Sequence, residues 1–261
     1  MAKTLRKIYA GSIELASLTC RGDRRDSPQQ RAAKHKASSE AQKRMNQINS
    51  LQQLELMLAV NFPTAGSGLV ITLTYDDQHL PKTRAEAQRR MKYFLQKLRA
   101  ARKAAGLPEP VVAMAPEVLT SASGRWHHHI VLNNTGHDYD MVRACWIYGT
   151  DIEIRPLRVD KKKNHETQAR YMSKELRECQ DAVSKPGLHG WSWTRNAKRP
   201  ETDTVTVPDD YELEPPEDST VLLDESRSTE WASWRVLKIR YNASPDEGFP
   251  RARRRRRKRR E

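Results

Sequence analysis

Residues 124–133 have the sequence GRWHHHIVLN, in which three consecutive histidines precede an apolar run. The run of Ile, Val and Leu is typical of a strand anchored in a core. Because side chains alternate along a strand, His127 and His129 would share one face and His128 would point to the other. Two imidazoles roughly 6–7 Å apart on one face can converge on a divalent cation. On spacing alone, ordinary surface histidines at a polar strand edge are the more common explanation.

A second strand is expected upstream, at residues 111–118, and a turn containing Ser and Gly would join it to the histidine strand. If this turn is centred near Ala122, Glu117 lies opposite His127 in the hairpin. Opposite residues of an antiparallel pair have their side chains on the same face. The pattern therefore predicts Glu117 on the face that holds both histidines.

Two imidazoles and one carboxylate, with coordination positions left open, suit Mg²⁺ or Mn²⁺ bound next to a phosphate. Glu117 is the candidate carboxylate, and His127 and His129 are the other two candidate ligands. Asp76 or Asp77 could supply the carboxylate instead, and Glu117 would then be an ordinary surface residue.

A candidate nucleophile lies in the segment ARYMSKEL, within the helix expected over residues 165–179. Tyr171 and Lys174 are three residues apart, so they would occupy neighbouring positions on one helix face. A phenol, with a reference pKa of about 10, is a poor nucleophile at neutral pH. An adjacent ammonium and a nearby cation would favour the phenolate or orient a phosphate. Many helices contain such a pair by chance, as a surface Tyr beside a solvated Lys.

The remaining pattern alternates strands with helices. Residues 69–75 (LVITLTY) are β-branched and apolar, as in a buried strand. Residues 84–105 have apolar positions at helical spacing on one side and many Lys and Arg on the other. A short helix is expected at 138–146 and another strand at 151–157. The fold class predicted is α+β, with a central antiparallel sheet flanked by helices.

The charge is concentrated at the end of the chain. The formal net charge is +14, and residues 251–260 (RARRRRRKRR) contribute nine positive charges, which leaves +5 for the remainder. Such a tail binds a nucleic-acid backbone whatever its sequence, although a membrane-surface tail, an RNA-binding tail or a solubility feature has the same composition.

Composition also limits the cellular setting. The three cysteines are widely spaced, so neither a disulfide framework nor a thiolate zinc site is expected. No apolar run approaches the roughly 18–20 residues of a membrane span, and the first residues lack the apolar segment of a signal peptide. A cytoplasmic protein with no membrane partner is therefore expected.

Three segments, in this order, resemble the HUH endonuclease superfamily: LVITLTYDD (69–77), RWHHHIVLN (125–133) and RYMSKE (170–175). Within it, the chain is similar to rolling-circle replication initiators, including the replication proteins of small phages and plasmids and the gene II proteins of filamentous phages. Relaxases have their tyrosine before the histidines, whereas here the histidines come first. The resemblance covers about residues 40–200.

Two smaller segments extend the resemblance. Trp146 and Gly149 are similar to the family's WxxG segment, and residues 194–200 are similar to its SRNxxxP segment. The chain departs from the family at two positions. His128 occupies the middle of the HUH motif, where the family generally has a hydrophobic residue, and Thr194 replaces the usual Ser.

The resemblance implies a function and a site. His127 and His129 would hold a divalent metal ion, Tyr171 would attack a phosphate, and Lys174 would orient the tyrosine or the phosphate. The products would be a 5′-phosphotyrosyl link and a free 3′-OH primer, and the reverse step would rejoin strands. The expected partners are single-stranded origin DNA and a host helicase with its replication machinery, in a bacterial cytoplasm.

Five regions are expected along the chain. The centre, residues 64–200, would be the HUH nicking domain, preceded by a basic extension with a strand and a helix at 1–63. Between residues 201 and 230 there are eleven acidic residues and one basic residue, which predicts a disordered acidic linker. A strand at 231–242 would return to the sheet, and a disordered basic tail would cover 243–261.

The DNA is expected to cross the basic face of residues 84–103. Trp126, Trp191 and Trp193 are available for stacking on bases, or else for core packing. A non-catalytic DNA-binding regulator would explain the charge but not the paired motifs. A structural metal-binding or RNA-associated protein would not explain the motif order, and HUH-type transposases share that order but are usually smaller.

Overall fold

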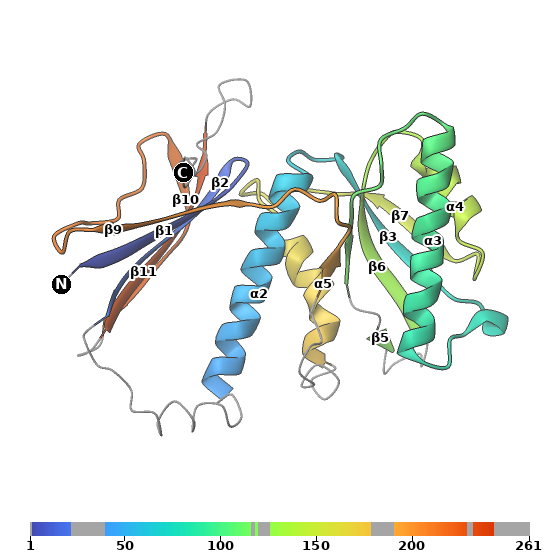
Figure 1. Cartoon of the computed structure of the whole chain (residues 1–261), viewed down its shortest axis with the longest axis horizontal. Coiled ribbons are helices and arrows are strands. Elements are labelled where there is room, and N and C mark those ends of the chain that lie inside the picture. The colour runs from blue at the N-terminus through green and yellow to red at the C-terminus, as the bar shows by residue number, and fades with distance from the viewer. Residues whose placement is uncertain are drawn as a thin grey trace, which may run out of the picture. The chain divides into compact units, whose positions relative to one another are not determined.

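The structure, a computed structural model, describes residues 2–21, 40–115, 118–119, 126–178, 191–228 and 232–242, the side chains at 21, 40–43, 118–119 and 174–178 excepted. The chain divides into two compact units. Residues 50–198 form what we call the central unit, and residues 1–49 with 199–261 form the terminal unit (Figure 1). The predicted boundary of the nicking domain at residue 64 is therefore too late, because the second half of the preceding helix belongs to the central unit.

The central unit is built on an antiparallel sheet with the strand order β7-β3-β6-β4-β8, in which the short β5 also pairs with β6. The histidine strand, β6, lies in the middle of this sheet. The predicted α+β fold is confirmed, with two antiparallel sheets and four flanking helices among the described residues. The strands of the central sheet are β3 (Gly68–Thr74), β4 (Val112–Met114), β5 (Val118–Leu119), β6 (Trp126–Asn133), β7 (Ile152–Pro156) and β8 (Ser192–Trp193).

One face of the central sheet, called the α3 face, packs against α3 (Arg84–Ala104) and α4 (Asp138–Cys145) (Figure 1). Alternation along β3 brings every second side chain to this face, and helical spacing along α3 supplies the partners. The buried residues are Leu69, Ile71 and Leu73 of β3, Met91, Phe94 and Leu98 of α3, and Ile130 and Leu132 of β6. A short 3-10 helix, η1 (Asp77–His79), follows β3.

The opposite face, called the α5 face, packs against α2 (Glu40–Asn61) and α5 (Glu166–Glu178). The imidazole of His165 fixes the start of α5, because its Nε2 lies 2.8 Å from the carbonyl oxygen of Phe62, just after α2. The core of this face consists of Leu54, Leu58, Phe62, Val70, Val131, Ala169 and Met172, with others.

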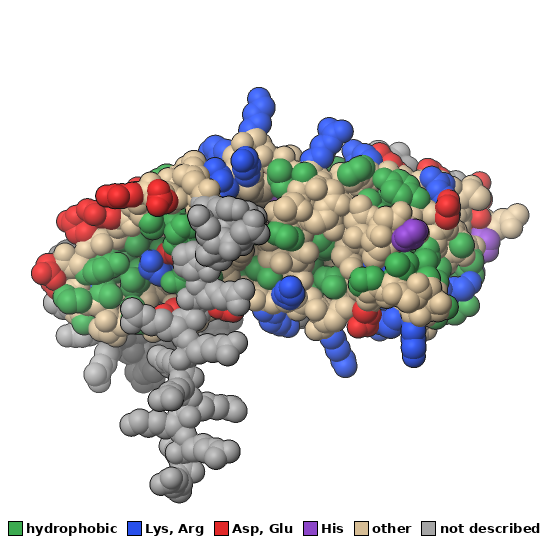
Figure 2. All heavy atoms as spheres, turned by 90° about the horizontal axis from the view of Figure 1, so that it is seen from above, with side chains coloured by type: hydrophobic (Ala, Val, Ile, Leu, Met, Phe, Trp, Pro, Cys, Tyr) green, Lys and Arg blue, Asp and Glu red, His purple; other side chains and the backbone are tan. Residues whose placement is uncertain are grey.

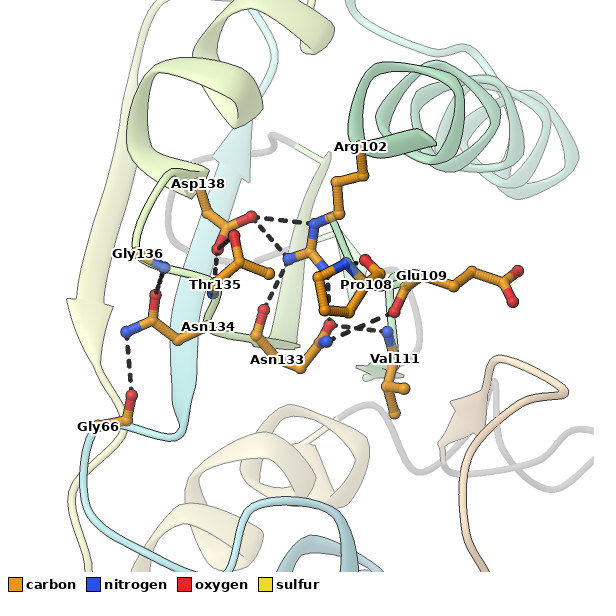
Figure 3. Close-up of polar contacts among 10 residues, drawn as sticks. All are labelled: Gly66, Arg102, Pro108, Glu109, Val111, Asn133, Asn134, Thr135, Gly136 and Asp138. Atoms are coloured by element: carbon orange, nitrogen blue, oxygen red, sulfur yellow. Dashed lines mark hydrogen bonds and ion pairs between the residues drawn. The ribbon is translucent and has the colours of Figure 1, made fainter. Parts of the chain in front are cut away.

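A buried polar cluster joins α3 to the end of β6 (Figure 3). Arg102 and Asp138 are both fully buried, and the Nη2 of Arg102 lies 2.6 Å from Oδ1 of Asp138. Arg102 also donates to the carbonyl oxygen of Asn133 (2.6 Å) and to that of Pro108 (3.2 Å). Asp138 in turn accepts hydrogen bonds from the backbone and hydroxyl of Thr135. The cluster therefore fixes the positions of α3, α4 and the end of the histidine strand.

The terminal unit is a five-stranded antiparallel sheet with the order β10-β11-β2-β1-β9. It buries apolar side chains and one carboxylate, Glu14, which pairs with Lys7 (2.8 Å) and accepts a hydrogen bond from the Tyr241 hydroxyl. Acidic side chains gather over this sheet (Figure 2, red, at the left). The strands are β1 (Lys3–Ala10), β2 (Ile13–Arg21), β9 (Glu201–Val207), β10 (Ser219–Ser228) and β11 (Ala232–Tyr241).

Three predictions about the ends of the chain need correction. The prediction of a disordered linker at 201–230 is wrong for most of that segment, because residues 201–207 and 219–228 are strands. The single strand expected in the basic extension at 1–63 is a hairpin of β1 and β2, in which Gly11 has the positive φ (62°) that favours glycine. The strand at 232–241 exists, but it pairs with β10 and β2 rather than with the central sheet. The basic tail, 243–261, lies outside the described residues.

Among the described helices, none combines the length and the apolar character needed to cross a membrane.

Candidate metal and nucleophile site

His127 and His129 both project from β6 onto the α5 face. In the ladder between β3 and β6, His127 lies opposite Thr74 and His129 lies opposite Thr72. The two imidazole rings are 4.6 Å apart between centroids and inclined at 80°. His129 is buried, with 7% of its surface exposed, and His127 is half-buried. Two imidazoles this close on one face match the donor chemistry of a divalent-metal site.

Tyr171 approaches the same pair of histidines from α5. Its ring centroid lies 5.3 Å from that of His129, in an edge-on arrangement, and 41% of the side chain is exposed. Its neighbours Ala169 and Met172 are buried against the sheet, so the helix is anchored on both sides of the tyrosine. The structure thus brings together three of the residues predicted from the sequence, and it leaves the tyrosine accessible to a large substrate.

Thr72 is a site residue that the sequence analysis missed. Its hydroxyl lies 3.2 Å from the Nδ1 of His129. If Nδ1 carries the proton and donates it to the hydroxyl oxygen, the lone pair on Nε2 is presented for metal binding. Hydrogen bonds to the second ring nitrogen commonly orient metal-binding histidines. Only the register between β3 and β6, which no local pattern determines, could have revealed this contact.

We therefore expect Thr72→Val to weaken Mn²⁺ binding by about tenfold or more, because the isosteric side chain cannot fix the ring of His129. Isothermal titration calorimetry with Mn²⁺ alone measures this effect without a reaction. Thr72→Ser, which keeps the hydroxyl, should restore binding. The matched control is Thr74→Val, two residues along the same strand face and opposite His127. Equal affinities for Thr72→Val and the wild-type protein would rule out the orienting contact.

His128, the unusual middle residue of the motif, points into the core of the α3 face. It is 1% exposed, and its Nε2 lies 2.7 Å from the hydroxyl of Tyr75. Burial, reinforced by the neighbouring imidazoles of His127 and His129, lowers the pKa of His128 to about 3. The side chain is therefore neutral at physiological pH and packs beside Tyr75 and Trp146 as a hydrophobic residue would. The departure from the family pattern leaves the strand register intact.

The carboxylate predicted to complete the site is Glu117. Glu117 lies outside the described residues, but the hairpin around it is informative. The predicted register holds from Val112, opposite Leu132, to Ala115, which bonds to His129. It then shifts by one residue, since Val118 rather than Glu117 lies opposite His127. The position of Glu117 as a ligand stays a prediction.

Other carboxylates lie near the histidines in sequence or in the sheet. Asp76 accepts hydrogen bonds from the backbone N–H of His79 (2.9 Å) and from its Nδ1 (2.7 Å). Glu153, on β7, lies opposite Thr72 and so shares the α5 face, but it pairs with Arg155 at 3.2 Å. Among the described residues, no three His, Cys, Asp or Glu side chains converge closely enough to hold a metal ion.

Lys174 lies in α5, one turn after Tyr171. The structure describes the backbone but not the side chain at this position, so its role in orienting Tyr171 or a phosphate stays a prediction.

The WxxG segment supports the end of β3 that faces His127. The indole Nε1 of Trp146 donates to the carbonyl oxygen of Thr74 (3.0 Å). Gly149 lies so close to this strand that an added Cβ would be 2.4 Å from the same oxygen. A side chain at position 149 would therefore displace Thr74, the residue opposite His127 in the ladder.

The segment that resembles SRNxxxP holds β8 against β4. The hydroxyl of Thr194 accepts from the backbone N–H of Val112 (3.0 Å), and Asn196 donates to the carbonyl oxygen of Pro110 (3.1 Å). A serine hydroxyl could make the first bond equally well, which explains why Thr replaces Ser here without chemical consequence.

The three candidate stacking tryptophans favour the packing alternative. Trp126 is partly buried against the core of the α3 face, and Trp191 and Trp193 are partly buried against the core of the α5 face. Trp193 stacks on Phe62, with ring centroids 6.0 Å apart, and the Nε1 of Trp191 donates to Ser50.

The predicted path of the DNA across α3 conflicts with the placement of the site. The buried residues of α3 pack on the α3 face, whereas His127, His129 and Tyr171 lie on the α5 face. The sheet separates the two surfaces. A DNA strand that lies along α3 therefore does not pass the histidines. The basic face of this helix needs a separate explanation.

An antiparallel sheet with a His-x-His strand at its centre, and a tyrosine helix across the same face, is consistent with an HUH-like or Rep-like fold. Residues 68–180 match the model of the family described as replication-associated protein ORF2/gene II protein. This match bears out, for residues 68–180, the family resemblance that the motifs predicted. Neither the curated proteins nor the solved structures yield a match.

Proposed function

We propose that the chain is a rolling-circle replication initiator that nicks single-stranded origin DNA through Tyr171 and later rejoins the strands. The observation that supports this most is the approach of Tyr171 to His129, with ring centroids 5.3 Å apart, beside the His127–His129 pair. A regulator that only binds DNA has no need for a phenol, two imidazoles and their shared sheet face. The match to a replication-associated family supports the same class.

Each residue of the candidate site has a separate role in the proposed reaction. His127 and His129, with a carboxylate such as Glu117, would hold a Mg²⁺ or Mn²⁺ ion, which when bound supplies positive charge for the phosphate. The phenolic oxygen of Tyr171 attacks phosphorus, and the bond from phosphorus to the 3′-oxygen breaks. The phenolic proton passes to solvent, and the leaving 3′-oxygen gains a proton. Lys174, one turn along α5, would orient the phenol or the phosphate.

This step creates a 5′-phosphotyrosyl link and a free 3′-OH. One phosphoester bond is exchanged for another, so attack by a 3′-OH on the link can rejoin two ends. Because a polymerase extends a 3′-OH, the nick would prime synthesis by the replication machinery of a bacterial host, with a host helicase as a further proposed partner. An HUH-type transposase would use the same site, and the sequence of the cleaved DNA distinguishes the two.

The proposal predicts a metal-dependent covalent adduct. The full chain is incubated with labelled single-stranded DNA tiled across its own gene and flanking sequence, with Mn²⁺, and products are separated under denaturing conditions. At least one tile should form an adduct that resists denaturation. A chelator removes the metal, and His129→Ala removes one of its proposed ligands. Either should reduce the yield of the adduct at least about a hundredfold. Adduct formation that persists undiminished in chelator would exclude the metal site, and the absence of any adduct would exclude the nickase.

A further inference from the structure

The outward side of α3 forms a row of cations that the proposed chemistry does not use. Arg89, Lys92 and Lys103 are exposed, and they lie on the side of the helix opposite the buried line of Met91, Phe94 and Leu98. At about 1.5 Å per residue, the row extends over roughly 21 Å from Arg89 to Lys103. We call Arg89, Lys92 and Lys103 the outer row of α3.

Other cations of the same helix are committed to the fold. Arg90 pairs with Glu86 (2.6 Å), Arg99 pairs with Glu109 (2.7 Å), and Arg102 is buried against Asp138. No ion pair within 4 Å joins the outer row to a described residue, although the charge of Arg89 acts on Glu86 over a longer distance, and the three charges are carried on long, exposed side chains. These three positive charges therefore contribute little to the stability of the fold.

The partner that fits such a row is a rigid line of negative charge. Duplex DNA has one phosphate per roughly 1.7 Å of axis, and cations along a straight helix can contact its backbone irrespective of sequence. A single strand would be bound chiefly by aromatic rings on which bases stack. The exposed aromatic ring beside the outer row is that of Tyr93, and the ammonium of Lys97 covers one of its two faces, 5.5 Å from the centroid.

We infer that the outer row of α3 binds the phosphate backbone of duplex DNA, on the opposite side of the central sheet from Tyr171. The protein would then hold duplex with one face and a single strand with the other. The surface is defined by α3 alone, and only its use in replication rests on the proposed function. A nicking enzyme gains from this arrangement, because the duplex that flanks an opened origin is held while the single strand occupies the α5 face.

The test compares two full-length variants with the same change in charge. One is Arg89→Gln/Lys92→Gln/Lys103→Gln, which keeps good helix-forming residues. The other is Arg158→Gln/Lys161→Gln/Lys162→Gln, three exposed cations before α5. Circular dichroism confirms that both fold. Binding of a labelled 25-base-pair duplex is measured by fluorescence anisotropy at several salt concentrations.

Each phosphate contact contributes about 0.9 to the slope of log affinity against log salt for duplex DNA. The α3 variant should therefore lose about 2–3 from the wild-type slope, whereas the control variant should lose less than about 1. Because all proteins keep the basic tail, its contribution cancels in the comparison. An unchanged slope, or equal losses in both variants, overturns the inference. So does a loss seen with a 25-nucleotide single strand and not with the duplex.

The adduct assay on a short single-stranded tile separates this inference from the proposed function. The α3 variant should form the adduct as the wild-type protein does, since the tile cannot reach both faces. One outcome is that neither the wild-type protein nor the variants form an adduct, while the slope of log affinity for duplex against log salt still falls in the α3 variant. In that case the nickase is excluded and the duplex surface stands. If adducts form normally and the slope is unchanged, the duplex surface is excluded and the nickase stands.

Discussion

Tyr171→Phe should abolish the covalent protein–DNA adduct, with a reduction of at least about 10³-fold in the rate of strand cleavage. The substitution removes one oxygen atom, the proposed nucleophile, and enzymes that lose their nucleophile fall by this much or more. Tyr171 is 41% exposed on an anchored helix, so the change should neither create a cavity nor alter the fold. The measurement is the fraction of labelled single-stranded DNA that stays with the protein under denaturing conditions.

The matched control is Tyr93→Phe, on the other side of the sheet. Tyr93 has nearly the same exposure, 44%, and also projects from a long helix, so it controls for the general loss of a surface phenol. It should form the adduct at the wild-type level. Binding of the uncleaved strand should be nearly equal in all three proteins, because the hydroxyl is needed for chemistry rather than for affinity. An adduct that survives Tyr171→Phe would show that another group attacks the phosphate.

The part of the fold that carries the candidate site was predictable because its signals are local. The alternation in WHHHIVLN determines which histidines share a face, and the 3.6-residue period around Tyr171 determines which side of α5 is buried. Both hold wherever the strand and helix dock. These local signals are weak by themselves, and it was the order of the motifs and the resemblance to the HUH superfamily that made His127, His129 and Tyr171 candidates.

Contacts that depend on register were beyond the sequence. The hydrogen bond between Thr72 and His129 requires the alignment of β3 with β6, which lie more than fifty residues apart. The alignment predicted for Glu117 assumed a regular hairpin, whereas the observed register shifts by one residue between Ala115 and Val118. Such a shift moves every following side chain to the face opposite the one predicted, and the amino-acid composition does not predict it.

The prediction of disorder for the acidic segment, residues 201–230, failed for a different reason. Averaged over thirty residues, its charge indicated disorder, yet Thr202, Thr204 and Val205 are residues that favour strands. Their strand β9 is completed by β1, which lies nearly two hundred residues earlier in the chain. Burial of Val207 against Leu5 and Leu213 stabilises this pairing, and the acidic side chains remain in solvent. Net charge excludes a buried segment, but it does not exclude a strand with one solvated face.

Disruption of the Arg102–Asp138 pair should destabilise the central unit by about 3–5 kcal/mol, the range for removing one partner of a buried ion pair. Both side chains are fully buried, and Asp138 also accepts two hydrogen bonds from Thr135. In Asp138→Ala, the guanidinium stays in the core without its counter-charge, and the donors of Thr135 lose their acceptor. Urea unfolding followed by tryptophan fluorescence measures the change in the free energy of unfolding.

Arg99→Met is the control on the same helix. Its partner Glu109 is about half exposed, so the loss of this ion pair should cost less than about 1 kcal/mol. A double variant, Arg102→Met/Asp138→Ala, separates the charge effect from the packing effect. It should be more stable than Asp138→Ala alone, because no unpaired charge remains in the core. If Asp138→Ala and Arg99→Met were equally mild, the cluster in Figure 3 would contribute nothing to holding α3 and α4 against β6. The position of the histidine strand would then depend on apolar packing alone.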